Sequence, residues 1–119
     1  MRVGFALALL ISALPAQAAE LDAVSLRGEL VGPLIQWWEN DGWHSGQLKL
    51  LPDGRAELMV DAPERTSDGG RWTIRGNQMC TAWQSLRAGS EKCYSVEQVS
   101  PTRFITSGGN VFEIMTAGA

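Results

Sequence analysis

The chain has 119 residues, with 10 Lys and Arg against 13 Asp and Glu, and a formal net charge of −3 at neutral pH. This length fits one small domain. The positive charges form no basic stripe, which excludes nucleic acid as an expected partner.

The N-terminal residues are typical of an export signal. Arg2 supplies a short positive region, and residues 3–14 form an apolar segment too short to cross a bilayer. Residues 16–18, Ala-Gln-Ala, match a small-x-small cleavage site. We therefore expect cleavage after Ala18 and a periplasmic or secreted protein. No later apolar run is long enough to cross a membrane.

Residues 19–33 form an N-terminal arm or a short helix. Asp22 is a suitable helix cap, and Ala23, Leu26 and Leu30 follow at helical spacing. An extended arm is the alternative. Gly32 and Pro33 end this segment, so we place the boundary of the main domain, residues 34–119, after them.

From Leu34 onward the chain alternates apolar and polar residues, which predicts short β-strands. Turn residues separate them, for example Pro52-Asp53-Gly54, where Gly54 supplies a left-handed position. Residues 61–69 and 85–92 are polar and are predicted to be loops. The expected strands are 34–39, 43–51, 56–61, 70–75, 78–83, 93–99, 103–106 and 111–116.

The clearest local pattern is a hairpin over residues 70–83. Trp72 and Ile74 share one face of the first strand, as alternation predicts for a strand with one buried side. Gly76 and Asn77 form a two-residue turn signal, because both tolerate positive φ.

Only two cysteines are present, Cys80 and Cys93, and an oxidising compartment favours their pairing. The bridge would stabilise the domain by roughly 3 kcal/mol on the chain-entropy view. A redox-active pair is excluded, since catalytic cysteines are typically two residues apart at a helix N-terminus.

Evenly spaced strands joined by tight turns predict an all-β fold. Short connections favour pairing between sequence neighbours. We therefore expect an antiparallel up-and-down meander of about eight strands closing into a small barrel, which would remove exposed edges.

No residue pattern predicts catalysis. His44 is the only histidine, and its neighbour Ser45 points to the opposite face of a strand, which argues against a serine triad. Glu39, Asn40 and Asp41 lack the alternating spacing of a calcium loop. We expect no catalytic residue, no metal and no cofactor, and hence a protein that is not an enzyme.

Three tryptophans, Trp37, Trp38 and Trp43, flank one predicted hairpin beside His44. Adjacent strand residues face opposite sides, so one of Trp37 and Trp38 faces inward and the other outward. These four residues are a candidate binding surface. Cross-strand packing that only stabilises the hairpin is the alternative.

The motif of residues 70–80, Gly-x-Trp-x-Ile-x-Gly-Asn-x-Met-Cys, followed by Cys93, resembles a signature of small exported proteins of Gram-negative bacteria, especially alphaproteobacteria. Those proteins are domains of unknown function, and the resemblance implies a periplasmic β-barrel-like domain. A weaker resemblance is to secreted β-barrel inhibitors of bacterial metalloproteases, whose N-terminal arm enters the protease cleft.

Three functions remain open at this point. The first is an exported, non-enzymatic binding or accessory protein acting through its surface on an unknown periplasmic partner. The second is a secreted protease inhibitor that uses residues 19–31 as its arm. The third is a lipocalin-like carrier of a small apolar ligand, since an eight-stranded barrel can hold one.

Overall fold

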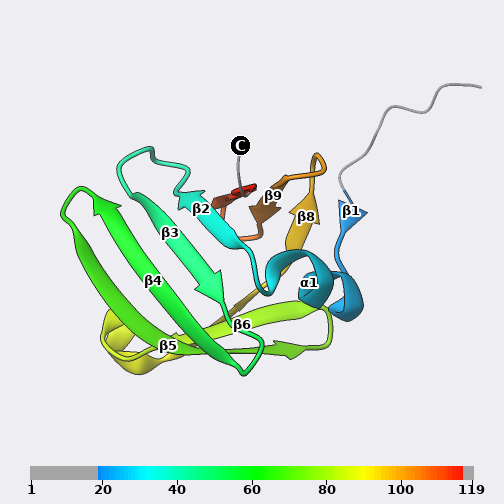
Figure 1. The fold of residues 1–119 in the computed structure, drawn as a ribbon, viewed down its shortest axis with the longest axis horizontal. Helices are drawn as coiled ribbons and strands as arrows, with labels where there is room; N and C mark the ends of the chain where they lie inside the picture. Colours follow the sequence, from blue (N-terminus) through cyan, green and yellow to red (C-terminus); the bar gives the residue numbers. More distant parts are fainter. Residues whose placement is uncertain (1–18, 117–119) are drawn as a thin grey trace, which may run out of the picture.

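The computed structural model describes residues 19–116 (Figure 1). The predicted signal peptide therefore lies outside the described residues. Within them, no helix is both long and apolar enough to span a bilayer. The elements are β1 (Ala19–Glu20), α1 (Ala23–Leu30), β2 (Leu34–Trp38), β3 (Ser45–Leu50), β4 (Arg55–Ala62), β5 (Thr66–Arg75), β6 (Gln78–Trp83), the 3₁₀ turn η1 (Leu86–Gly89), β7 (Glu91–Tyr94), β8 (Val96–Gln98), β9 (Arg103–Thr106) and β10 (Val111–Ile114).

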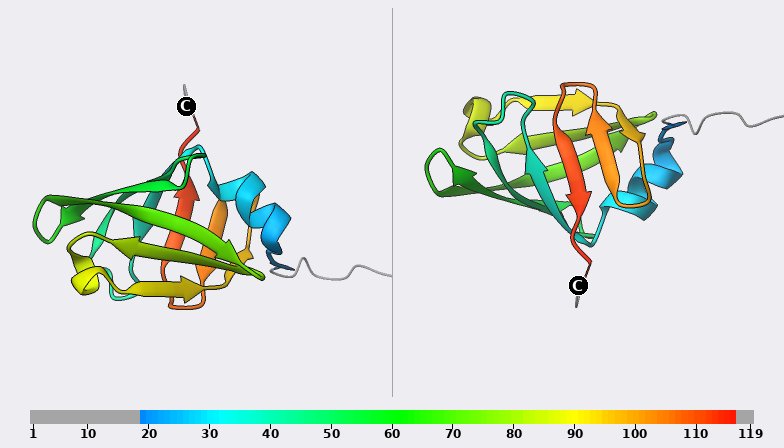
Figure 2. Two further views of the ribbon diagram at one scale, coloured as in Figure 1. Left: turned by 90° about the horizontal axis from the view of Figure 1, so that it is seen from below. Right: turned by 90° about the horizontal axis from the view of Figure 1, so that it is seen from above.

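The strands form one antiparallel sheet in the order β1-β8-β9-β10-β2-β3-β4-β5-β6-β7, which confirms the predicted meander. The last strand, β10, pairs with β2. At the other junction, β7 runs into β8 through Ser95 alone, and the Ser107 N–H donates to the Ser95 carbonyl at 2.9 Å. The sheet has ten strands where about eight were expected, and it curls around a common interior as a half-barrel with β1 and β7 as its two ends (Figure 2). Chain continuity at Ser95 joins β7 to β8, where no strand ladder does.

The N-terminal segment forms the short helix α1 and not an extended arm. The Asp22 carboxylate accepts from the Ser25 N–H at 2.8 Å, the predicted cap. Leu26 and Leu30 are fully buried, and α1 packs on β5 and β6. The helix thereby closes one end of the curled sheet (Figure 1).

The central hairpin is β5 and β6 with Gly76-Asn77 as its turn, as predicted. Gly76 has a φ of 58°, the left-handed value that favours glycine there. Trp72 is buried, and its indole N–H donates to the Leu51 carbonyl at 2.7 Å. This bond ties the hairpin to the Pro52–Gly54 turn, so Trp72 fixes two parts of the meander.

The predicted disulfide is present. Cys80 of β6 and Cys93 of β7 are directly paired across the ladder and are covalently joined. The bridge lies beside the point where β7 leaves β6, and it holds together the two strands whose pairing ends there.

Three predicted segments were wrong. Most of residues 61–69 is strand and not loop, because β4 runs to Ala62 and β5 starts at Thr66, which leaves only residues 63–65 as the connection. The polar residues there still pair, as Asp68 does with Leu58, because this part of the sheet is largely solvent-facing. The loop 85–92 is shorter, since β7 starts at Glu91. The strand 93–99 is divided at Ser95, where its partner changes from β6 to β9.

Alternation decides which residues fill the interior. Inward positions on successive strands are apolar and largely buried, while their neighbours are exposed. The core residues are Leu21, Leu26, Leu30, Ile35, Trp37, Leu48, Leu50, Ala56, Trp72, Met79, Trp83, Val96, Phe104 and Phe112.

Candidate functional site

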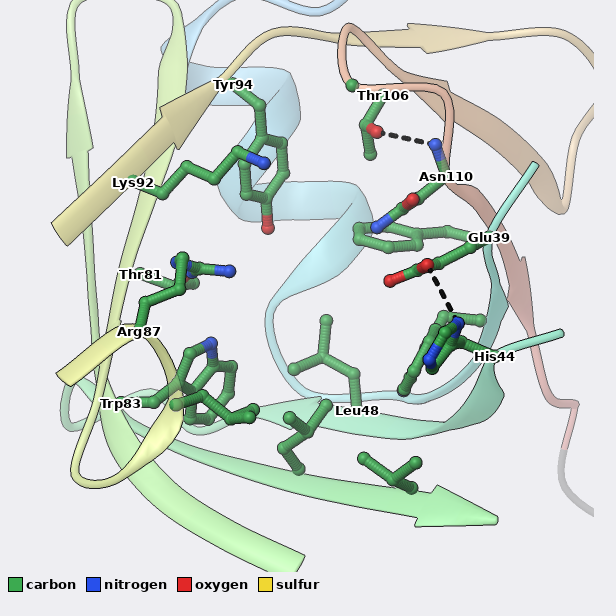
Figure 3. A pocket seen from close by; sticks show the side chains of 16 residues that line it. Glu39, His44, Leu48, Thr81, Trp83, Arg87, Lys92, Tyr94, Thr106 and Asn110 are labelled. Carbon is green, nitrogen blue, oxygen red and sulfur yellow. Dashed lines mark hydrogen bonds and ion pairs between the residues drawn. The ribbon is translucent and has the colours of Figure 1, made fainter. Parts of the chain in front are cut away.

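The interior is not filled along its whole length. At the end away from α1, a cavity of about 240 Å³ remains. Seven strands line it, together with the segments that join them at this end (Figure 3). Its apolar wall consists of Trp37, Leu48, Leu58, Val60, Trp83 and Phe112.

The position of Trp37 depends on a glycine in the neighbouring strand. Trp37 pairs with Gly46, where the β3–β4 register shifts. A Cβ at Gly46 would lie 1.8 Å from the Met59 carbonyl oxygen and 3.0 Å from Cζ2 of Trp37. Only glycine allows this close approach, so the Trp37 indole packs beside the Gly46 backbone and forms part of the cavity wall.

The indole nitrogen of Trp37 is a buried hydrogen-bond donor. The side chain is only 7% exposed. Its Nε1 has no hydrogen-bond partner in the described part of the chain. Buried polar groups normally have a partner, since leaving one unpaired is unfavourable.

Tyr94 points its hydroxyl into the cavity from β7 (Figure 3). Its ring contacts Phe112 edge to face, with centroids 6.2 Å apart. Burial raises the pKa of Tyr94 well above its usual range, and the nearby charge of Arg87 only partly opposes this. The phenol is therefore protonated at neutral pH and is available as a donor.

Two cations lie on the same side of the cavity as Tyr94, namely Arg87 of η1 and Lys92 of β7 (Figure 3). Arg87 has a φ of 54° and the next residue, Ala88, a φ of 53°, so both are left-handed. The Asp68 carboxylate holds this turn: it accepts from the N–H groups of Ser85 at 3.1 Å and Leu86 at 2.9 Å.

The opposite side of the cavity carries Glu39, His44 and Asn110 (Figure 3). Nδ1 of His44 lies 3.2 Å from Oε1 of Glu39 and 3.5 Å from Oδ2 of Asp41. The backbone N–H of Trp43 donates to Asp41 and lowers the pKa of that carboxyl. The mouth is thus cationic on one side and acidic on the other.

Glu39, Asp41 and His44 also bring potential metal-ligating atoms within 4.8 Å of one another. The sequence analysis considered Glu39 and Asp41 only as a calcium loop and did not group His44 with them. All three side chains are about half exposed. The close contacts of His44 with its two acidic neighbours account for this grouping without a metal.

The structure separates the predicted binding-surface residues. Trp37 faces the interior, and Trp38 faces outward, where Arg103 stacks on its ring at 5.1 Å. Trp43 is 71% exposed in the turn before β3, and His44 lies at the cavity mouth. Trp37 and His44 therefore belong to the cavity, and Trp38 and Trp43 to the outer surface.

Arg87, Lys92 and Tyr94 were not recognised from the sequence. One signal was readable: Lys92, Tyr94 and Val96 alternate, so a lysine occupies an inward position in line with a buried valine. Thr81 and Thr106 are likewise buried polar residues at inward positions. Polar residues on the apolar face of a strand indicate a lined cavity better than isolated motifs do.

Comparison of the chain with protein-family models, with curated proteins and with solved structures found no match. The fold and the cavity define a small disulfide-containing antiparallel β protein with one end closed by a helix and one end open.

Proposed function

We propose that this protein is an exported, non-enzymatic binding protein that takes one small, largely apolar ligand into the cavity at its open end. The observation that carries the proposal is the cavity of about 240 Å³, which persists in a domain whose other end is filled. Protein interiors are normally packed without such spaces. An apolar cavity of about 150 Å³ already accepts benzene.

The absence of a reactive set among the cavity residues supports a binding role over catalysis. His44 contacts Glu39, and no serine or cysteine lines the cavity in residues 19–116. The predicted signal peptide and the Cys80–Cys93 bridge support export, because disulfides persist mainly in oxidising compartments.

The packing of the N-terminal segment favours the cavity over an inhibitory arm. Leu21, Leu26 and Leu30 are all at most 5% exposed and belong to the core. An arm that inserts into a protease would have to leave these positions and expose the interior. The helix is better explained as the closure of the barrel.

The test is saturable binding of a neutral apolar probe, N-phenyl-1-naphthylamine, followed by its fluorescence. Leu58→Trp should fill the cavity and abolish binding, because Leu58 lines its wall. Met59→Trp is the matched control, since Met59 is the next residue and is 36% exposed on the outer face.

Circular dichroism and thermal melting establish that both variants fold. Should Leu58→Trp prove unstable, Val60→Phe fills the same wall with a smaller change in volume. A probe that does not bind, or that binds the filled and control variants equally, would show that the cavity is not a ligand site.

A further inference from the structure

Three donor side chains lie together on one side of the cavity. Arg87, Lys92 and the Tyr94 hydroxyl all lie on the wall formed by η1 and β7 (Figure 3). Within residues 19–116, neither Arg87 nor Lys92 has a carboxylate within 4.0 Å, although Arg55, Arg75 and Arg103 each have one. Arg27, Lys49, Arg65 and Arg71 likewise have none. Among the Lys and Arg residues of the described chain, however, only Arg87 and Lys92 line this apolar cavity.

From this arrangement we infer that the ligand is a small organic acid, with an apolar or aromatic body in the cavity and its carboxylate against Arg87 and Lys92. The inference rests on the proposed function and specifies the ligand class. A guanidinium presents a planar fork of N–H donors that suits a carboxylate.

The backbone around Arg87 is consistent with this role. Arg87 and Ala88 occupy left-handed conformations that residues other than glycine rarely adopt. Asp68 fixes the turn through its bonds to Ser85 and Leu86. Strained backbone of this kind persists where the surroundings hold it, and it frequently marks ligand contacts.

The acidic side of the mouth does not prevent anion binding. Glu39 lies across the cavity from the cationic wall and contacts His44 at 3.2 Å (Figure 3). It therefore sets the orientation, since a carboxylate is attracted to the Arg87 side and repelled from the Glu39 side. The apolar residues Leu48, Leu58 and Val60 between the two sides suit a ring or a short chain.

The experiment compares three probes of similar shape by calorimetry at low ionic strength: 3-phenylpropionate, its neutral amide, and the cation 3-phenylpropylamine. We expect the acid to bind at least about tenfold more tightly than the amide, equivalent to about 1.4 kcal/mol. Arg87→Gln and Lys92→Gln should each remove most of this preference, because they lower the affinity for the acid far more than that for the amide. Circular dichroism and thermal melting establish that both variants fold. Arg71→Gln changes the net charge equally on an exposed outward residue of β5, and should alter neither affinity.

The outcomes separate the two proposals. If the amide or the amine binds as tightly as the acid, or if both glutamine variants keep the acid preference, the inference about an anion is wrong while the cavity remains a ligand site. The same holds if N-phenyl-1-naphthylamine binds and none of the three probes does. If that neutral probe also fails to bind, the proposed function fails and the anion inference with it.

Discussion

The two ends of this molecule differ in how completely their interiors are packed. At the closed end, Leu26 and Leu30 of α1 are completely buried. At the open end, the same curled sheet surrounds a cavity lined by Arg87 and Lys92, neither of which has a carboxylate within 4.0 Å among residues 19–116. If the proposed function is correct, stability and binding are separated in space. A helix supplies packing at one end, and the other end is thereby free to keep a space that reduces packing.

The largest expected effect on the free energy of unfolding comes from a substitution at the closed end. Leu30→Ala should lower the free energy of unfolding by about 2–5 kcal/mol, because it leaves a void in a filled core. Leu58→Ala removes the same atoms at the cavity wall and should lower it by about 1–2 kcal/mol, since Leu58 is only partly buried beside an existing space.

Urea denaturation of both variants measures this contrast. Val24→Ala, at an 80% exposed position of α1, controls for changes in helix propensity. Equal losses for Leu30→Ala and Leu58→Ala would mean that the two ends are packed alike, and the comparison would not hold.

The second effect concerns the disulfide, which joins β6 to β7, the strand that carries Lys92 and Tyr94. Replacing both Cys80 and Cys93 by alanine should lower the free energy of unfolding by about 3 kcal/mol. Because the bridge lies beside the break at Ser95, the amide protons of β7 should lose protection from exchange first. Hydrogen exchange followed by NMR measures this. Uniform loss across β2 and β3 would contradict a local role for the bridge.

Sequence reasoning was most successful where one local pattern determined the structure. The β5–β6 hairpin, the Asp22 cap and the disulfide each depend on residues that are close in sequence or have only one possible partner. The loop predicted at 61–69 was wrong because polarity there reflects solvent exposure of a long hairpin. The division at Ser95 was missed because a change of strand partner leaves no mark on an alternating pattern.

The candidate site was less accessible from the sequence for a physical reason. Its wall brings together β2, β6, β7 and β10, so no single segment contains it. Alternation correctly predicted that one of Trp37 and Trp38 faces inward, and in the structure it is Trp37. The contact between its indole and Gly46 could not be predicted, because it depends on the pairing of β2 with β3, which the sequence alone does not supply.

A third, smaller effect concerns Asp68, which holds the turn that carries Arg87. Burial raises the pKa of the Asp68 carboxyl, but hydrogen bonds from the Leu86, Ser85 and Gly69 N–H groups outweigh it, so the pKa lies below its usual value. A lowered pKa in the folded state adds stability that is present above the unfolded value, about 3.9, and is lost as the pH falls through the folded value.

Asp68→Asn should therefore lower the free energy of unfolding by about 1 kcal/mol at pH 7, and the difference from wild type should shrink below about pH 4. Denaturation midpoints from pH 7 to pH 3 measure it. Asp61→Asn is a suitable control, since Asp61 is exposed at the end of the same hairpin. A difference that stays constant with pH would show that the charge of Asp68 does not matter.

The smallest effect has the opposite sign and concerns the turn that presents Arg87. Ala88 has a φ of 53° and a ψ of 32°, a conformation that is unfavourable for alanine by about 1 kcal/mol or more. Ala88→Gly should relieve this, less the entropy that glycine adds to the unfolded chain, for a net gain of about 0.5 kcal/mol. Ala82→Gly, in the extended strand β6, should instead lower stability by about 0.5–1 kcal/mol. Melting temperatures of the Ala88→Gly and Ala82→Gly variants measure both changes in stability. Two losses would mean that Ala88 is not left-handed, and the turn would then direct the Arg87 side chain elsewhere than toward the cavity.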